Sequence, residues 1–298
     1  MNTLNIIKAG LIFITLFYFT SCKEKPVDLK KEITITGSES EKLVVQYLAN
    51  QFAQLNKGVN IIVKGGGSEY GIIKLKDGDC DIANSSRVFD DADYAEFKKN
   101  NVKQAIIAVD AIAIVTHPSL GMDKLSLEQL SGIYAGRIKN WKEIGGPDLD
   151  ILPIGRKTGS GTRLYMQHRL NIEEFSPMLP EFKRYEEIIA QVAKNKNAIG
   201  YVSLEHALSI DGRPNASTYI MPVSIDGVEA KFPYDKEAIS YGDYPLIRPL
   251  FQYYHPGQNE YIEKFIQFEL SDEGQRLLQK IGYYPINDFH KQINKVKM

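Results

Sequence analysis

The sequence has few of the residues that build disulfide frameworks, metal centres or nucleophilic active sites. Only two of its 298 residues are cysteine, and its five histidines do not show the spacing of metal ligands. No Ser–His–Asp or Cys–His arrangement is evident either. We therefore expect a protein that is not an enzyme and that holds no cofactor and no metal.

An excess of charge of either sign is also missing. The chain has 36 Lys and Arg against 37 Asp and Glu, which gives a net charge of −1 at pH 7. Nucleic-acid binding usually requires a strongly basic surface, so we expect no nucleic-acid partner. The hydrophobic fraction of 43% is enough for a substantial core, and this length favours more than one folding unit.

The apolar stretch at the N-terminus is short. It covers residues 9–19 after Lys8, which is too few residues for a comfortable membrane span but suits the core of a signal peptide. Thr20-Ser21-Cys22 is similar to a bacterial lipoprotein cleavage site, although Phe19 stands where leucine is usual. These features predict a signal peptide over residues 1–21.

Cleavage there would make Cys22 the first residue of a palmitate-bearing lipoprotein. The polar residues 22–32 would then form a lipid-anchored tether. The alternative is a signal peptide without lipidation. Lipidation of Cys22 would leave Cys80 without a disulfide partner, and we expect Cys80 to be a small residue of the core.

The segment from position 156 to 170 combines a fixed positive charge with a turn of small residues that suits an anion. Arg156 precedes Gly159-Ser160-Gly161-Thr162, and residues 162–170 are typical of a helix. The free N–H groups and the dipole of a helix start favour an anion, and arginine offers a planar pair of donors. The alternative is an ordinary helix start, because Ser and Thr commonly cap helices.

Three further loops have a similar composition. Gly37–Ser40 lies between the alternating strand pattern of residues 33–36 and the amphipathic helix pattern of residues 43–55, and Gly65–Gly71 also lies between a strand pattern and a helix pattern. Asp81–Arg87 is a short apolar strand that ends in hydroxyls and an arginine. A nucleotide-binding G-x-G-x-x-G would need glycine at position 70, which is Tyr70. Together these loops predict a convergent site for a small oxyanion.

The order of these loops resembles that of the phosphate-binding proteins of the high-affinity phosphate ABC transporter, which are periplasmic substrate-binding proteins and include lipoproteins. The resemblance covers about residues 33–286. Besides the four loops, it rests on further passages in the family's order, at 110–116, 125–146, 198–201, 244–254 and 271–286.

The resemblance implies an α/β, two-lobed periplasmic-binding-protein (type II) fold, which agrees with the alternation of strand and helix patterns. Lobe I would comprise residues 33–112 and 247–298, and lobe II residues 113–246. Two extended crossover segments, at residues 110–116 and 244–254, would form the hinge between the lobes. The ligand would lie in the cleft between the lobes, where strand ends meet helix N-termini.

Carried over to this sequence, the resemblance implies phosphate contacts from all four loops. Arg156 would supply charge, Gly161 would allow close approach of the backbone, and Glu39 would contribute its backbone N–H. The implied contacts are Ser38, Glu39, Ser40, Ser68, Ser86, Arg87, Arg156, Ser160, Gly161 and Thr162.

Three positions in these loops differ from residues that are frequent in the family. Glu39 stands where Ser or Thr is frequent, Thr158 where some members have an acid, and Ser86 where an Asp often lies. Discrimination against sulfate needs an acceptor for the proton of hydrogen phosphate. We hypothesise that Glu39 or Glu69 supplies it. The alternative is that both acids only complement a helix dipole.

The function implied by the resemblance is binding of inorganic phosphate and its delivery to an ABC permease in the inner membrane. The protein would be a monomer, lipid-anchored on the periplasmic side of the cell envelope, and its lobes would close over the anion. Three alternatives stay open: binding of sulfate, molybdate or tungstate by the same fold, an enzyme acting on phosphoesters, and a lipid-anchored phosphate sensor or adhesion module.

Overall fold

The computed structural model describes residues 32–87, 91–225 and 227–297. The predicted signal peptide, the lipidation of Cys22 and nearly all of the tether lie outside the described residues. Among the helices in these ranges, none combines the length and the apolar composition needed to cross a membrane.

The fold consists of strands and helices that alternate along much of the chain. The strands are β1 (Glu32–Gly37), β2 (Asn60–Lys64), β3 (Ile82–Ser85), β4 (Lys103–Thr116), β5 (Leu125–Ser126), β6 (Leu152–Arg156), β7 (Glu181–Phe182), β8 (Ala198–Ser203), β9 (Tyr219–Met221), β10 (Val223–Ser224) and β11 (Ile247–Tyr254).

The helices include one short 3₁₀ turn, η1. They are α1 (Glu39–Leu55), α2 (Ser68–Lys76), α3 (Asp91–Lys99), α4 (Leu127–Tyr134), η1 (Trp141–Ile144), α5 (Gly161–Arg169), α6 (Tyr185–Lys194), α7 (Leu204–Ala207), α8 (Lys236–Tyr241), α9 (Glu260–Leu270), α10 (Asp272–Gln279) and α11 (Asp288–Lys297).

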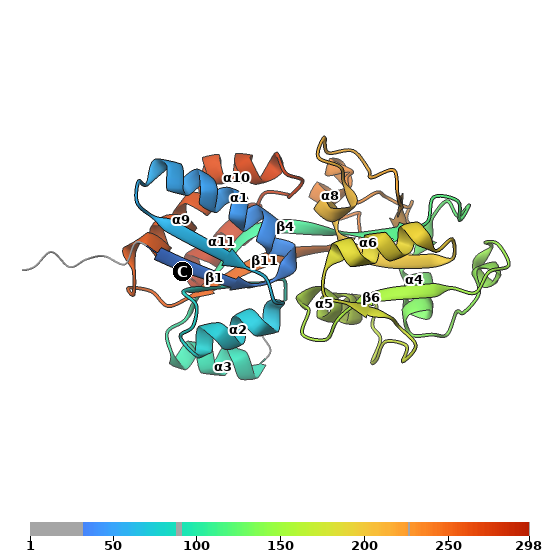
Figure 1. Cartoon of the computed structure of the whole chain (residues 1–298), viewed down its shortest axis with the longest axis horizontal. Helices are drawn as coiled ribbons and strands as arrows, with labels where there is room; N and C mark the ends of the chain where they lie inside the picture. Colours follow the sequence, from blue (N-terminus) through green and yellow to red (C-terminus); the bar gives the residue numbers. More distant parts are fainter. Residues whose placement is uncertain (1–31, 88–90, 226, 298) are drawn as a thin grey trace, which may run out of the picture.

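One mixed sheet extends through the whole molecule. Its nine strands follow the order β2-β1-β3-β11-β4-β8-β6-β7, and β9 pairs with β4 beside this path. The strands β1, β2 and β3 are parallel to one another, as are β6 and β8, whereas β4 and β11 are antiparallel partners. Figure 1 shows two lobes, with β4 and β11 passing from one to the other.

Lobe I has a core on each face of its sheet. Apolar residues of β1, β2 and β11 pack against α1, α9 and α10 on one face, where Phe52 meets Phe265 edge to face. The opposite face packs against α2 and α3 and includes Cys80, which is buried as predicted. Figure 1 shows these helices on opposite sides of the sheet. Successive residues of β11, such as Tyr253 and Tyr254, enter different cores, as the pleat of a strand requires.

Lobe II has a separate core around the second half of β4. Nearly all residues from Ala111 to Val115 are fully buried there, together with Trp141, Tyr134 and Tyr201. The 14-residue strand β4 is thus apolar enough to be covered in both lobes, and its many β-branched residues suit an extended conformation. Trp141, Tyr134 and Tyr201 are therefore packing residues of this core.

Most predicted elements are confirmed, with shifted ends. The helix predicted over residues 43–55 begins earlier, at Glu39, and the helix predicted over 162–170 is α5. The extended segment predicted at 110–116 is the end of a longer strand, because residues 103–109 pair with β11. The other extended segment begins at Ile247, after Pro245, which lacks the N–H that a sheet partner needs.

Candidate anion-binding site

The first two loops meet the end of β3. Ser38 precedes α1, and its backbone N–H donates to the Asn84 carbonyl over 2.9 Å. Its hydroxyl donates to the Ser86 hydroxyl over 3.1 Å. Ser68, at the start of α2, accepts from the backbone N–H of Ser86 over 3.1 Å. Three predicted contacts from three segments of lobe I, all almost fully buried, therefore lie together.

Gly37 explains how the first loop comes so close to β3. Its φ of 139° lies in the region that favours glycine, and a Cβ there would stand 2.2 Å from the Asn84 carbonyl oxygen. Gly161 has the same role from lobe II. A Cβ on Gly161 would lie 2.3 Å from the Ser68 hydroxyl oxygen and 2.6 Å from that of Ser86. The start of α5 thus lies directly against the serines of lobe I.

Hydroxyls also meet across the two lobes. The Ser40 hydroxyl oxygen lies 3.2 Å from that of Thr162 in α5. Ser160 caps the same helix, with its hydroxyl accepting from the Arg163 backbone N–H over 3.4 Å. The predicted contacts Ser38, Ser40, Ser68, Ser86, Ser160, Gly161 and Thr162 are accordingly brought into one region by the tertiary structure.

Arg156 supplies a positive charge at this region, with donors that no described residue uses. Its side chain is only 2% exposed, yet its Nε and Nη1 have no hydrogen-bond partner among the described residues. The guanidinium stacks on the ring of Tyr185, 4.0 Å from the ring centroid. A buried arginine with unused donors is costly unless an anion satisfies them, which fits a site for an oxyanion.

The remaining predicted contacts lie at the edge of this region. The Glu39 carboxylate accepts from the Gly66 backbone N–H over 2.8 Å, and it lines a pocket of about 120 Å³ together with Arg156 and Ser160. Arg87 forms an ion pair with Asp93 over 2.9 Å. Arg87 also lines a neighbouring pocket of about 270 Å³, which reaches Ser160 as well. Roles for Glu39 and Arg87 in binding stay predictions.

Glu69, the other hypothesised proton acceptor, is exposed at the start of α2. Its backbone N–H donates to the Gly159 carbonyl over 3.3 Å, which adds a contact between the lobes. Its side chain lines the 270 Å³ pocket.

An arginine and an aspartate that the sequence reasoning missed lie directly behind the serines. Arg248 on β11 donates to the Ser40 hydroxyl over 2.6 Å. It also donates to Asp110 on β4 from Nε over 3.1 Å and from Nη2 over 2.8 Å. Both side chains are at least 98% buried. The signal in the sequence was a charged residue within each of the two apolar segments 110–116 and 244–254, which lie far apart along the chain.

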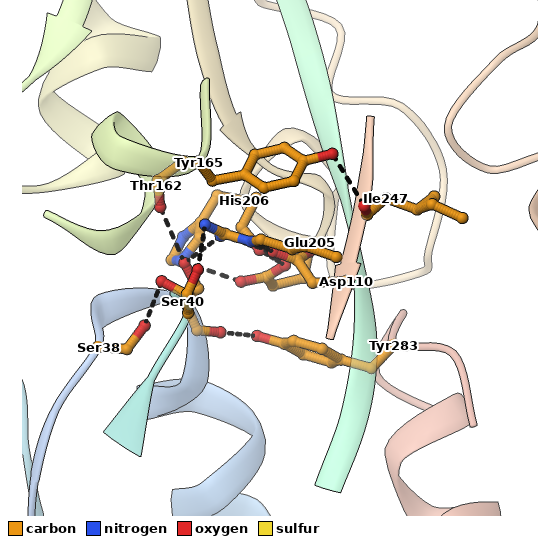
Figure 2. A network of polar contacts seen from close by, with 12 residues as sticks. Ser38, Ser40, Asp110, Thr162, Tyr165, Glu205, His206, Ile247 and Tyr283 are labelled. Carbon is orange, nitrogen blue, oxygen red and sulfur yellow. Dashed lines mark hydrogen bonds and ion pairs between the residues drawn. The ribbon is translucent and has the colours of Figure 1, made fainter. Parts of the chain in front are cut away.

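Asp110 extends this network into lobe II. The Ser203 hydroxyl oxygen lies 2.7 Å from Asp110 Oδ1 and 2.6 Å from Glu205 Oε2. His206 Nε2 is 3.3 Å from the other carboxylate oxygen of Glu205. Figure 2 shows Asp110, Glu205 and His206 near Ser40, to whose carbonyl the Tyr283 hydroxyl donates. The Ser203 hydroxyl has a single proton, so it can donate to only one of the two carboxyl groups at a time. The other carboxyl group can form its hydrogen bond only by donating to Ser203, so the geometry favours one protonated carboxyl group.

Burial raises the pKa of both carboxyl groups. The pKa of Glu205 rises to about 7, mainly because the charged form is desolvated. The pKa of Asp110 rises to about 6 for the same reason, although the nearby charge of Arg248 opposes the shift. The buried network therefore holds Glu205 protonated at a pH where an exposed glutamate is ionised.

This difference predicts a loss of stability with rising pH. The unfolded chain releases the Glu205 proton near its ordinary pKa of 4.5, and the folded protein releases it near 7. The stabilisation is thus present below pH 4.5 and is lost as the pH rises towards 7, by roughly 3 kcal/mol. Urea unfolding between these pH values should show a smaller decline for Glu205→Gln. Glu260→Gln, at an exposed position, should retain the wild-type decline.

Among the described residues, no group of three or more His, Cys, Asp or Glu side chains could hold a metal ion. The groups that the site offers are hydroxyls, backbone N–H groups at helix starts and the guanidinium of Arg156. These are donors for the oxygens of a tetrahedral anion.

The fold and the site together define a two-lobed α/β binding protein with a candidate anion site where its lobes meet. The chain belongs to the PBP superfamily, because the model of the PBP superfamily domain matches residues 25–273. The predicted fold class is therefore confirmed. As a member of a superfamily of binding proteins, the protein is not an enzyme.

Known relatives of this chain are named as phosphate-binding proteins, the family that its sequence resembles. The phosphate-binding protein PstS of Bacillus subtilis is 27% identical over 86% of this chain and 81% of its own length. PstS of Staphylococcus aureus strain USA300 is 26% identical over 91% of this chain and 84% of its own length. The resemblance to phosphate-binding proteins is thus confirmed.

Solved structures support the same relationship. A structure from Clostridium perfringens, described as a phosphate ABC transporter substrate-binding protein with bound phosphate, has a TM-score of 0.76 and 31% identity. The match covers 86% of this chain and the whole of the Clostridium perfringens chain. An ABC-type phosphate transport receptor from Vibrio cholerae has a TM-score of 0.69 and 27% identity, over 85% of this chain and all of its own.

Proposed function

We propose that the protein binds inorganic phosphate between its lobes and delivers it to an ABC permease in the inner membrane. The observation that carries this proposal is Arg156, a buried guanidinium with unused donors beside the clustered hydroxyls of both lobes. Relatives named as phosphate-binding proteins, and a structural neighbour with bound phosphate, support phosphate as the anion.

The mechanism that we propose is closure of the lobes over the anion. The predicted bounds, 33–112 with 247–298 for lobe I and 113–246 for lobe II, place Ser40 and Thr162 in different lobes. An anion that binds both hydroxyls stabilises the closed form by its extra affinity for that form. The closed form would then dock on the permease. Micromolar affinity would correspond to about −8 kcal/mol.

We also propose the location that the N-terminal sequence predicts. The protein would act as a monomer on the periplasmic side of the cell envelope, lipid-anchored through Cys22. Mass spectrometry of the protein purified from membranes should find Cys22 as an acylated N-terminal residue. An unmodified N-terminus would support the alternative of a signal peptide without lipidation.

Calorimetry tests the proposed function. Phosphate, sulfate and molybdate should be titrated into a soluble form that begins at Lys23. We expect phosphate to bind most tightly. A preference for sulfate or molybdate would keep the anion site but change the transported anion. Absence of binding for all three would remove the transport function and favour an adhesion module.

A further inference from the structure

Tyr185 lies inside the candidate site although the family resemblance did not implicate it. It is the first residue of α6, and its side chain is 1% exposed. Its hydroxyl oxygen lies 2.6 Å from the hydroxyl oxygen of Ser40, and it forms a second hydrogen bond with Thr162. One hydroxyl thus contacts two predicted anion contacts, one from each lobe.

The ring of Tyr185 also supports the site's available charge. The Arg156 guanidinium stacks on it at 4.0 Å, and its Nε and Nη1 have no hydrogen-bond partner within the described ranges. An anion that binds Arg156 together with the hydroxyls of Ser40 and Thr162 must therefore come within reach of the Tyr185 hydroxyl, because this hydroxyl already touches both.

The direction of the hydrogen bonds leaves Tyr185 able to accept. Arg248 donates to the Ser40 hydroxyl oxygen over 2.6 Å, so Ser40 must direct its own proton towards Tyr185, Thr162 or the anion. A tyrosine hydroxyl both donates and accepts. The neighbouring carboxylates are engaged elsewhere: Asp110 accepts from Arg248 and Ser203, and Glu39 accepts from the backbone of Gly66.

We propose that the Tyr185 hydroxyl is a further contact of the bound anion and accepts the proton that distinguishes hydrogen phosphate from sulfate. This inference rests on the proposed function and deepens it. A buried acceptor favours the ligand that brings a proton, since sulfate brings none. The hydroxyl can also turn and donate to sulfate, so the discrimination is weaker than a carboxylate would provide.

Tyr185→Phe tests this role, because phenylalanine keeps the ring under Arg156 and removes only the hydroxyl. Calorimetry at slightly alkaline pH should compare phosphate and arsenate, which carry a proton, with sulfate and selenate, which do not. We expect affinity for phosphate and arsenate to fall about tenfold, and affinity for sulfate and selenate to change by less than about threefold.

Two control variants make the comparison specific. Tyr254→Phe removes a hydroxyl from a buried ring in the core of lobe I, at the opposite end of β11 from Arg248, and should leave all four affinities unchanged. Glu39→Gln tests a competing acceptor: it keeps the backbone N–H predicted to bind phosphate and removes the carboxylate, and if Tyr185 accepts the proton the ratio of phosphate to sulfate affinity stays near the wild-type value. A fall in the ratio of phosphate to sulfate affinity in Glu39→Gln, without a fall in Tyr185→Phe, would show that Glu39 accepts the proton and would overturn the proposal.

Other outcomes are also decisive. An unchanged phosphate affinity in Tyr185→Phe, or an equal loss for all four anions, would overturn the proposal. Failure of the wild-type protein to bind phosphate would instead overturn the proposed function. The variant should fold, because Ser40 and Thr162, 3.2 Å apart, can still pair.

A crystal structure of the wild-type protein with phosphate provides a test that needs no variant. It should place a phosphate oxygen within about 3 Å of the Tyr185 hydroxyl. A separation beyond about 4 Å would contradict a direct contact.

Discussion

Replacing Arg156 with methionine is expected to weaken phosphate binding by at least about 100-fold. Hydrogen bonds to a charged group contribute about 1.5–3 kcal/mol each, and Nε and Nη1 can together make two of them. Two such bonds amount to about 3 kcal/mol or more, which corresponds to the stated factor. Calorimetry with phosphate measures the effect.

Arg156→Lys separates charge from geometry. Lysine keeps a positive charge but lacks the planar pair of donors, so we expect an intermediate loss. Arg137→Met removes the same charge from an exposed site and should change the affinity by less than about twofold. A loss below tenfold in Arg156→Met would show that Arg156 does not carry the binding energy and would contradict the proposed site.

The second large effect concerns stability. Asp110→Ala should destabilise the protein by about 3–5 kcal/mol, because it leaves the Arg248 guanidinium buried without its carboxylate. For a chain of this size the midpoint of thermal unfolding should fall by roughly 10 °C. Calorimetric unfolding of the two proteins, at a pH where the wild-type Asp110 is ionised, measures the difference.

Matched variants test whether the buried pair is the cause. Glu260→Ala breaks an exposed ion pair with Lys264 on α9 and should cost less than about 1 kcal/mol. The double replacement of Asp110 by leucine and Arg248 by methionine removes both charges, and it should recover most of the lost stability. If the double variant is as unstable as Asp110→Ala, packing rather than the unpaired charge explains the loss.

Local patterns were sufficient to predict most of the elements that form the site. The alternation at residues 33–36 and the apolar face of residues 43–55 correspond to β1 and α1, because side-chain periodicity follows from backbone geometry. The small residues at 159–162 likewise marked the start of α5. Element ends were less accurate, as with β4, whose first half depends on pairing with β11.

The residues behind the site could not be predicted in the same way. Arg248 is 138 positions from Asp110 and 208 from Ser40, so no local spacing connects them. Tyr185 at the start of an amphipathic helix is typical of a core residue. Only the folded chain shows that its hydroxyl lies beside Ser40 and Thr162.

The sequence by itself determined the α/β class, the helix starts that suit an anion and the resemblance to phosphate-binding proteins, because these depend on short-range patterns and on their order along the chain. The tertiary structure decided which hydroxyls meet, that Arg156 has unused donors, and that Asp110, Arg248 and Tyr185 lie around Ser40. Those contacts join segments of both lobes to β4 and β11, and packing of distant segments, rather than local preference, sets their distances.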